Sequence, residues 1–434
     1  MDAIHRLPDS SSILTRLAAA RRATVAFAAA TGVVAVHVAD DAFLQPRVGT
    51  SAGDHLASGL VPIGALVLAA VGYPRVRAGL RAALALFFGL FALVVGTTEA
   101  LYYTLKVGPS GDDYTGLLAI PAGLVLLGLA GATLWRSRRL DDSRWWRYPR
   151  RALIGAAGVV FVAEVVFAIG LGFGTTHLMR PVVPAAHLGT AYENVAFTTS
   201  DGLRLEGWYI PSRNGAAVIA FPGRSGPQKH ARMLARHGYG VLLFDRRGEG
   251  ASEGDPNLFG WGGDKDILAA IEFLKHRPDV DPDRIGGIGF SVGGELMLQA
   301  AAESDELAAV VSEGAGTRWL KEEIEEYDTI PGWDKWLSLP LYAVKTGSVA
   351  VFSNTAPPPK LTDLVPRITQ PLYLIWAPNG GNAETMNPVY YRLAGGPKTI
   401  WEIPDARHIQ GITAHPREYE QRVIGFFDRS LPAD

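Results

Sequence analysis

The chain has 434 residues, long enough for two or three domains, and carries 41 Lys and Arg against 43 Asp and Glu. This balance indicates neither a nucleic-acid partner nor an acidic substrate. Cysteine is absent, which excludes disulfides, thiolate metal sites and cysteine nucleophiles but does not fix the redox compartment. Hydrophobic residues make up 48% of the chain, and they are distributed unevenly.

Five apolar runs occupy the first 175 residues. Each has about 20 residues, the length that a helix needs to cross the hydrocarbon core of a bilayer. Polar side chains do not recur at every third or fourth position, as they would in a soluble core helix. We therefore expect an all-α transmembrane bundle of five helices over residues 1–175, with the lipid bilayer as its partner. The runs cover roughly 23–39, 56–73, 82–103, 114–135 and 152–174.

The loops between these runs differ in positive charge. Fourteen arginines lie before the first run or in alternate loops, whereas the other two loops hold only Arg47 and Lys106. The positive-inside rule then places the N-terminus in the cytoplasm and everything after the fifth run outside the cell membrane. Seven of the arginines lie in 136–151, where topology explains them better than nucleic-acid binding does. An uncleaved anchor is favoured over a signal peptide for the first run, because His37 stands where cleavage needs a small residue.

Three ionisable residues, His37, Glu99 and Glu164, lie within or near the predicted spans. Glu164 is mid-span, where a charge is costly and a functional role is common. A protonated or helix-paired carboxyl that faces the bundle is the alternative, and the sequence leaves both open.

From about 176 the composition becomes that of a soluble domain, predicted over 176–434. Residues 193–211 read as two alternating strands joined by a turn at Asp201-Gly202. Apolar strands and amphipathic helices then alternate, which predicts a mostly parallel sheet covered on both faces. The strands are expected at 216–223, 240–245, 284–290, 308–313, 371–377 and 399–404, and the helices near 227–237, 263–276, from about 293, 387–394 and 416–429.

The pattern G-x-S-x-G occurs three times, around Ser51, Ser252 and Ser291. Ser51 lies in a loop between membrane spans, and Ser252 lies in a loop with no helix after it. Only Ser291 stands between an apolar strand and a helix, where a tight turn presents the hydroxyl at the carboxyl edge of the sheet. Ser291 is therefore the predicted nucleophile.

A serine nucleophile needs a base, which should follow the last strand of the sheet. His408 lies four residues beyond that strand and is the predicted base. The other histidines of the domain are less suitable: His415 precedes a helix start, and His230, His237 and His276 fall on helices or at their ends.

Two backbone amides should stabilise the oxyanion, and we expect those of Val292 and Arg224, which follow the nucleophile and the strand 216–223. The carboxylate that orients the histidine belongs after 371–377, where the first acidic residue is Glu384. Glu313 is the alternative acid. Asp405 is too close to His408 in sequence to reach the far ring nitrogen.

Residues 314–370 form an irregular stretch rich in aromatic side chains. These could line an apolar pocket over Ser291, belong to the core, or contact the bilayer, and the sequence does not choose among the three. The aromatic residues are Trp319, Tyr327, Trp333, Trp336, Tyr342 and Phe352.

The motifs FPGRSG, FDRRGEGAS, GIGFSVGGE and EIPDARH, in this order over about 216–430, resemble the α/β-hydrolase superfamily, closest to its serine aminopeptidase-like and dienelactone hydrolase-like branches. The resemblance implies a structural role for the turn that holds Asp245, Arg247 and Ser252, and a cap at about 314–370. Two features depart from the family: Pro222 replaces the usual His, and a Gly-rich loop with Glu384 replaces the usual Asp.

The sequence thus predicts a membrane-anchored serine hydrolase that cleaves an ester, thioester or amide of a small-molecule or lipid-like acyl substrate. No metal or organic cofactor is implied. A non-catalytic hydrolase-like domain for binding or signalling is the competing hypothesis, favoured by the missing Asp. A transporter with an accessory domain, resting on Glu99 and Glu164, is a third.

Overall fold

The computed structural model describes residues 10–136, 162–177, 179–326, 332–381 and 384–433. The chain divides into two compact units. The first comprises Met1–Arg47 and Ser51–Ala157, and the second comprises Val48–Thr50 and Gly158–Asp434.

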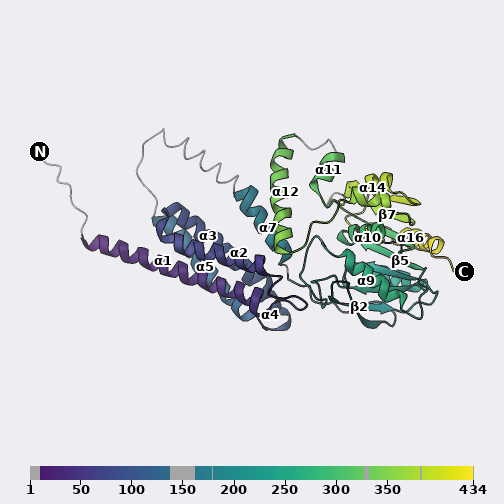
Figure 1. Cartoon of the computed structure of the whole chain (residues 1–434), viewed down its shortest axis with the longest axis horizontal. Helices are drawn as coiled ribbons and strands as arrows, with labels where there is room; N and C mark the ends of the chain where they lie inside the picture. The colour runs from purple at the N-terminus through teal and green to yellow at the C-terminus, as the bar shows by residue number, and fades with distance from the viewer. Residues whose placement is uncertain (1–9, 137–161, 178, 327–331, 382–383, 434) are drawn as a thin grey trace. The chain divides into compact units, whose positions relative to one another are not determined.

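The first unit is helical (Figure 1). Its long helices pack through small residues: a Cβ added to Gly123 would lie 2.9 Å from the Gly89 carbonyl oxygen. Such close backbone approach is typical of helix packing in membranes. The elements are α1 (Ser10–Ala39), η1 (Asp40–Leu44), α2 (Leu56–Gly72), η2 (Tyr73–Arg75), α3 (Ala78–Val95), η3 (Gly96–Leu101), α4 (Tyr102–Val107) and α5 (Asp113–Arg136).

The outward side chains of this unit are apolar, as lipid contact requires. Leu60, Leu68, Leu86 and Leu90 are all exposed, a pattern that would be unfavourable in water. Four helices of the described residues are long and apolar enough to cross a membrane: 17–44, 56–75, 78–107 and 113–136. These four apolar helices suggest a membrane-anchored protein.

The fifth predicted span differs from the other four. Residues 137–161 lie outside the described part, and the remainder forms η4 (Val162–Phe167) and α7 (Ala168–Thr176). These short elements belong to the second unit. There, α7 packs against α12 (Gly332–Phe352), so closely that a Cβ on Gly172 would lie 2.4 Å from the Ser348 Cβ. The described structure therefore has four candidate spans where the sequence predicted five.

The ionisable residues of the predicted spans have different surroundings. The His37 Nδ1 lies 3.2 Å from the Thr115 hydroxyl, which donates to Asp40 at 2.8 Å. In η4, one carboxylate oxygen of Glu164 is buried with no hydrogen-bond partner among the described residues. The Glu99 side chain lies outside the described part of the chain.

The second unit contains a mixed sheet of eight strands in the order β1-β2-β4-β3-β5-β6-β7-β8. β1 pairs with β2 and β2 with β4 in antiparallel fashion, and all other pairs are parallel. The predicted mostly parallel sheet is confirmed. The strands are β1 (Glu193–Thr198), β2 (Arg204–Ile210), β3 (Ala217–Phe221), β4 (Gly240–Phe244), β5 (Ile285–Phe290), β6 (Ala309–Glu313), β7 (Leu372–Trp376) and β8 (Lys398–Glu402).

Helices cover both faces of this sheet because its central strands are apolar on both sides (Figure 1). On β3, Ala217, Ile219 and Phe221 pack with α9, α10 and α14, whereas Val218 and Ala220 pack with α8 and α16. The parallel strands all end at one edge, where their following loops meet. The helices are α8 (Gln228–Arg236), α9 (Asp264–Lys275), α10 (Val292–Glu303), α14 (Asn387–Leu393) and α16 (Pro416–Ser430).

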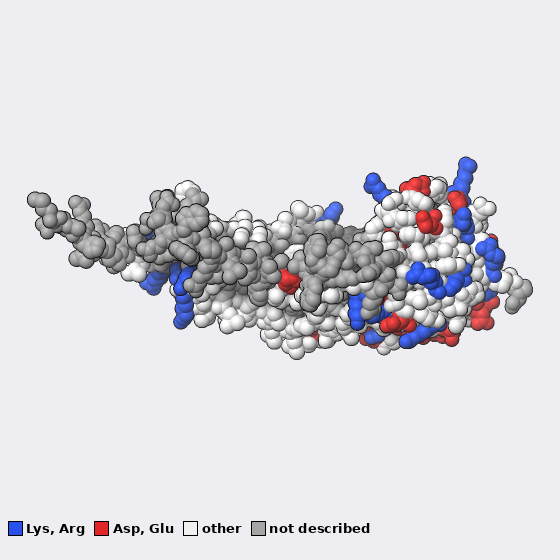
Figure 2. Space-filling model, turned by 90° about the horizontal axis from the view of Figure 1, so that it is seen from above, with Lys and Arg blue, Asp and Glu red and all other residues white. Residues whose placement is uncertain are grey.

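The described residues of 314–370 include four helical elements between β6 and β7: α11 (Leu320–Glu326), α12, α13 (Leu361–Leu364) and η5 (Val365–Arg367). Besides η4 and α7, the described part of this unit also contains the short helices η6 (Glu384–Met386) and α15 (Gly411–Ala414). Where Figure 2 shows described residues, charged side chains are dense over the sheet-containing unit, and fewer are visible on the helical one. This contrast agrees with one unit in water and the other in lipid.

Candidate active site

Ser291 occupies the turn between β5 and α10 in a left-handed backbone conformation, with φ 54° and ψ −124°. Gly289 and Gly293 flank this serine, and neither position has room for a side chain because other backbone atoms approach closely. A Cβ on Gly289 would lie 2.3 Å from the Gly293 carbonyl oxygen, and one on Gly293 would lie 2.5 Å from the Pro222 ring. The G-x-S-x-G pattern is thus the local condition for presenting this serine at the carboxyl edge of the sheet.

The structure brings the three predicted catalytic side chains together. The His408 Nε2 lies 2.8 Å from the Ser291 Oγ, and the His408 Nδ1 is hydrogen-bonded to Glu384. A carboxylate only accepts, so Glu384 holds the proton on Nδ1 and leaves Nε2 to accept from the serine. This arrangement can remove the serine proton as the hydroxyl attacks a carbonyl.

Glu384 is itself held by the backbone. Its side chain is buried, and its second oxygen accepts from the Ala377 N–H at 2.7 Å at the end of β7. The Asn387 amide donates to the Glu384 carbonyl oxygen at 2.7 Å. The Gly-rich loop therefore delivers a glutamate to the position where the family usually has an aspartate.

Glu313, the alternative acid, does not contact His408. Its buried carboxylate accepts from the Gly411 N–H at 2.9 Å and from the Tyr419 hydroxyl. Burial raises the pKa of Glu313 to about 7. Glu313 thus supports the loop of the base, and Asp405 instead bonds His415 at 2.8 Å.

The other two G-x-S-x-G serines have no such partners. Ser252 is fully buried, donates to the Asp245 carbonyl oxygen at 2.7 Å and accepts from the Glu206 N–H at 2.9 Å. Ser51 bonds Asp54 at 2.8 Å in a loop. These contacts agree with structural roles for both serines.

The two expected oxyanion amides differ in their present bonding. Val292 is the first residue of α10, so its N–H has no acceptor within the helix. The Arg224 N–H donates to the Asp245 Oδ1 at 3.1 Å, and the Arg224 Nε donates to Oδ2 at 2.9 Å. This buried ion pair could not be predicted from the sequence, because its members lie on different loops. The oxyanion role of Arg224 stays a prediction, since Asp245 already engages its amide.

A cavity of about 530 Å³ opens beside Ser291. Val292, Tyr342 and Leu320 contribute to its wall, so part of the predicted cap does lie over the serine. Three cationic side chains also line it, Arg246, Arg318 and Lys345. None of the three was predicted from the sequence, where the signal for Arg246 is an arginine directly after Asp245.

Two further aromatic residues of 314–370, Trp319 and Phe352, make packing contacts. The Trp319 indole donates to the Pro358 carbonyl oxygen at 2.9 Å, and Phe352 packs edge-on against Phe173 with ring centroids 5.3 Å apart. Both are packing contacts within the unit. Tyr327 and the side chains of Trp333 and Trp336 lie outside the described residues.

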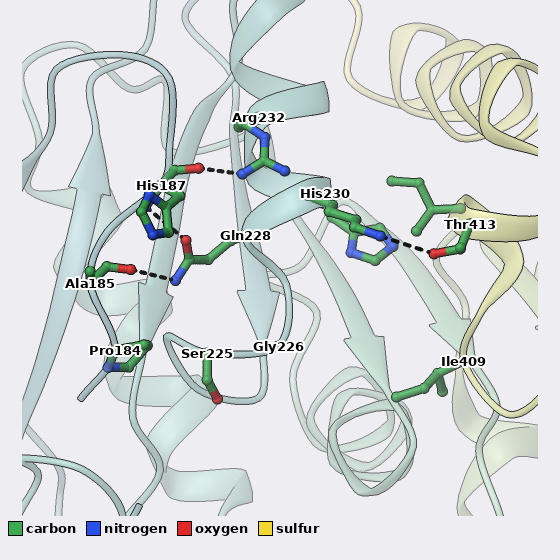
Figure 3. Close-up of a pocket in the computed structure, with 12 residues that line it drawn as sticks. Pro184, Ala185, His187, Ser225, Gly226, Gln228, His230, Arg232, Ile409 and Thr413 are labelled. Atoms are coloured by element: carbon green, nitrogen blue, oxygen red, sulfur yellow. Dashed lines mark hydrogen bonds between the residues drawn. The ribbon is translucent and has the colours of Figure 1, made fainter. Parts of the chain in front are cut away.

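A second cavity, of about 550 Å³, lies beside the loops after β3 and β8 (Figure 3). Ser225 and Gly226 of the first loop, Ile409 of the second and His230 of α8 line it, and none of the three predicted catalytic side chains does. Burial lowers the pKa of His230 to about 3, so this ring is neutral and serves as packing between Phe290 and Tyr419. Because Ser291 lines the cavity of about 530 Å³ and not this one, the former is the candidate substrate site.

Comparison with known proteins agrees with this architecture. Residues 179–348 match the family model of X-Pro dipeptidyl-peptidase (S15 family). The uncharacterized protein YfhR of Escherichia coli (strain K12) is 30% identical over 255 residues, which cover 55% of this chain and 81% of that protein. The chain belongs to the α/β-hydrolase superfamily.

Two further relatives extend the comparison. The α/β-hydrolase domain-containing protein WAV2 of Arabidopsis thaliana is 26% identical over 58% of this chain and 83% of its own length. Among solved structures, the Pyrococcus furiosus esterase Pf2001 is 25% identical, with a TM-score of 0.45 over 58% of this chain and 98% of that one. The matching family model is that of a peptidase, and the fold of the second unit is that of an α/β-hydrolase.

Proposed function

We propose that this α/β-hydrolase is a membrane-anchored enzyme that cleaves an ester, thioester or amide with Ser291, His408 and Glu384 as its catalytic triad. The observation that carries the proposal is the continuous hydrogen-bond chain from Ser291 Oγ through both ring nitrogens of His408 to Glu384. Activation of a serine hydroxyl requires a base and an acid in this arrangement, whereas ligand binding does not. The hydrogen-bond chain therefore favours catalysis over the binding or signalling alternative.

The reaction follows from this geometry. Ser291 Oγ forms a bond to the acyl carbon while His408 Nε2 takes its proton, and His408 then gives the proton to the departing alcohol, thiol or amine. Water, activated by the same nitrogen, releases the acyl group and restores the serine. The Glu384 carboxylate stabilises the imidazolium that forms in each half-reaction.

The tetrahedral oxyanion requires donors aimed at it, for which we propose the amides of Val292 and Arg224. The N-terminus of α10 adds a favourable dipole at Ser291. For the Arg224 amide to take part, the hydrogen bond that its N–H donates to Asp245 must lengthen, or the N–H must donate to both acceptors, as negative charge develops on the substrate.

The substrate is an acyl compound, either a small molecule or a lipid-like one. Four apolar helices support membrane anchoring, and the distribution of arginine supports a cytoplasmic N-terminus with the hydrolase unit outside. An exterior site near a bilayer has access both to lipids and to compounds outside the cell.

The proposal is tested with a fluorophosphonate probe that cannot cross membranes, applied to intact cells that express wild type or Ser291→Ala. Labelling of the wild type alone is expected. Ser51→Ala is the matched control, since Ser51 shares the G-x-S-x-G pattern, and it should label like the wild type. Labelling that requires lysis would contradict the orientation, and no labelling of folded protein in lysed cells would contradict the triad.

A further inference from the structure

The cavity beside Ser291 carries an excess of positive charge. Arg246, Arg318 and Lys345 line it, whereas Glu295 is the only carboxylate among the described residues of its wall. Burial raises the pKa of Glu295 to about 7, so its negative charge is incomplete at neutral pH. A wall of this kind attracts anions into a region where water screens charges poorly.

Arg246 is the most unusual of the three cations. Its side chain is 7% exposed and one terminal nitrogen pairs with Glu249. Its Nε and Nη1 are buried, and no atom of the described residues accepts a hydrogen bond from either. Buried guanidinium N–H groups without acceptors are costly, so two of them on one side chain point to an acceptor supplied by a ligand.

The position of Arg246 links these donors to the reaction. A Cβ added to Gly260 would lie 3.0 Å from the Arg246 Nη1 and 2.9 Å from the Val292 Cγ2. The buried edge of the guanidinium that has no acceptor among the described residues is therefore close to the residue that follows the nucleophile. An anionic group held there would belong to the same substrate molecule as the carbonyl at Ser291.

Lys345 adds a second available charge. Its ammonium lies 4.2 Å from the Tyr342 ring centroid and 4.8 Å from that of Phe259. No carboxylate of the described residues lies within 4.0 Å of it, and burial lowers its pKa. Arg318 differs, because its Nε lies 3.7 Å from Glu295 and its Nη1 donates to Gln299 at 2.5 Å. Arg246 therefore has hydrogen-bond donors without an acceptor among the described residues, and Lys345 has a charge without a carboxylate partner among them.

We infer that the acyl substrate carries a second, anionic group, either a carboxylate or a phosphate, in addition to its scissile carbonyl. Arg246 and Lys345 bind this anionic group. The inference rests on the proposed function, because it concerns the same site. Arg246 offers two N–H donors, as guanidinium groups do toward carboxylates and phosphates, and Lys345 supplies a point charge. Neither side chain takes part in the proton transfers.

The test compares two 4-nitrophenyl esters of matched length with the purified full chain: the monoester of glutaric acid, which is anionic, and the 4-nitrophenyl methyl diester of glutaric acid, which is neutral. We expect kcat/KM to be at least tenfold higher for the anionic ester. Hydrogen bonds to charged groups contribute about 1.5–3 kcal/mol, so Arg246→Met should lower this ratio roughly 10- to 100-fold. Arg236→Met, which removes an exposed arginine of α8, should leave the ratio unchanged.

Lys345→Met provides a second variant in case Arg246→Met fails to fold, and we expect it to lower the same ratio about tenfold, mainly through KM. Protection against fluorophosphonate labelling of the wild type distinguishes the two anions. Protection by glutarate but not by inorganic phosphate identifies a carboxylate, and the reverse identifies a phosphate.

Two results would overturn the inference in different ways. Equal or better hydrolysis of the neutral ester, with Ser291 still labelled, would contradict the anion site and leave the proposed hydrolase intact. A folded chain whose Ser291 neither reacts with the probe nor turns over either ester would contradict the proposed function, and the inference would fall with it.

Discussion

The Ser291 N–H donates a hydrogen bond to the Glu313 carbonyl oxygen at 2.9 Å. The carboxylate of the same glutamate accepts from the N–H of Gly411, three residues after His408. Glu313 therefore joins the turn of the nucleophile to the loop of the base. We predict that its buried side chain supports activity through the position of His408, because its carboxylate contacts Gly411 and Tyr419.

We expect Glu313→Ala to lower kcat about 10- to 100-fold with little change in KM, because a small displacement of a catalytic group is costly. Glu313→Gln, which can still accept from Gly411, should retain more activity. Glu306→Ala, which removes an exposed glutamate paired with Lys275, is the control. Equal effects of the Ala and Gln variants on KM alone would contradict a positioning role.

Replacing Glu384 by Gln should lower kcat by about 10³- to 10⁴-fold, because the amide no longer enforces the tautomer with the proton on His408 Nδ1. Steady-state hydrolysis of a neutral aryl ester measures the effect. Glu402→Gln changes an exposed glutamate of β8 and should have no such consequence. A Glu384→Gln enzyme within twofold of the wild type would rule out this glutamate as the orienting acid.

Both side chains of the Arg224–Asp245 ion pair are buried. Removing one of them therefore leaves the charge of the other buried and uncompensated. Asp245→Asn is expected to lower the free energy of unfolding by about 3 kcal/mol or more. The exposed pair Arg236–Glu420 provides the comparison, where Glu420→Gln should cost less than about 1 kcal/mol. Denaturant unfolding in detergent measures both, and a similar small loss for the two variants would contradict the structural role of Asp245.

His230 makes stability depend on pH. Burial, with a smaller contribution from the Lys229 charge, lowers its pKa from 6.5 to about 3. The unfolded chain therefore binds more protons between these values, and stability is lost as the pH falls through this window. At pH 5 the loss from this group is about 2 kcal/mol relative to pH 8.

His230→Phe should remove that loss, since phenylalanine preserves the aromatic packing and carries no proton. The measurement is the change in unfolding free energy between pH 8 and pH 5 for both proteins. His276→Phe, at the end of α9, is the control that leaves the buried ring in place. An unchanged pH dependence in His230→Phe would show that His230 is not the group responsible.

Much of the fold and the site could be predicted from the sequence. The apolar strands and the residues Ser291, His408 and Glu384 follow from local patterns, because a strand-turn-helix motif and the order of loops along one sheet edge are fixed by chain order. The Arg224–Asp245 pair could not be predicted, since it depends on the approach of two loops. The charged wall with Arg246 and Lys345 was missed for the same reason.

The membrane region shows a different limit. Hydropathy predicted five spans, and four appear among the described residues. The fifth run has the same composition, but its described part, Val162–Thr176, packs against α12 within the hydrolase unit. Residues 152–161 of this run lie outside the described part of the chain, so the fifth span stays a prediction.

The identity of the nucleophile is the central claim, and locating a covalent adduct tests it most directly. The purified full chain is treated with a fluorophosphonate, digested, and analysed by mass spectrometry for the modified peptide. We expect a single phosphonylated residue, Ser291, whose modification requires His408 and is lost in Ser291→Ala. An adduct on Ser51 or Ser252, or unchanged labelling of Ser291→Ala, would contradict it.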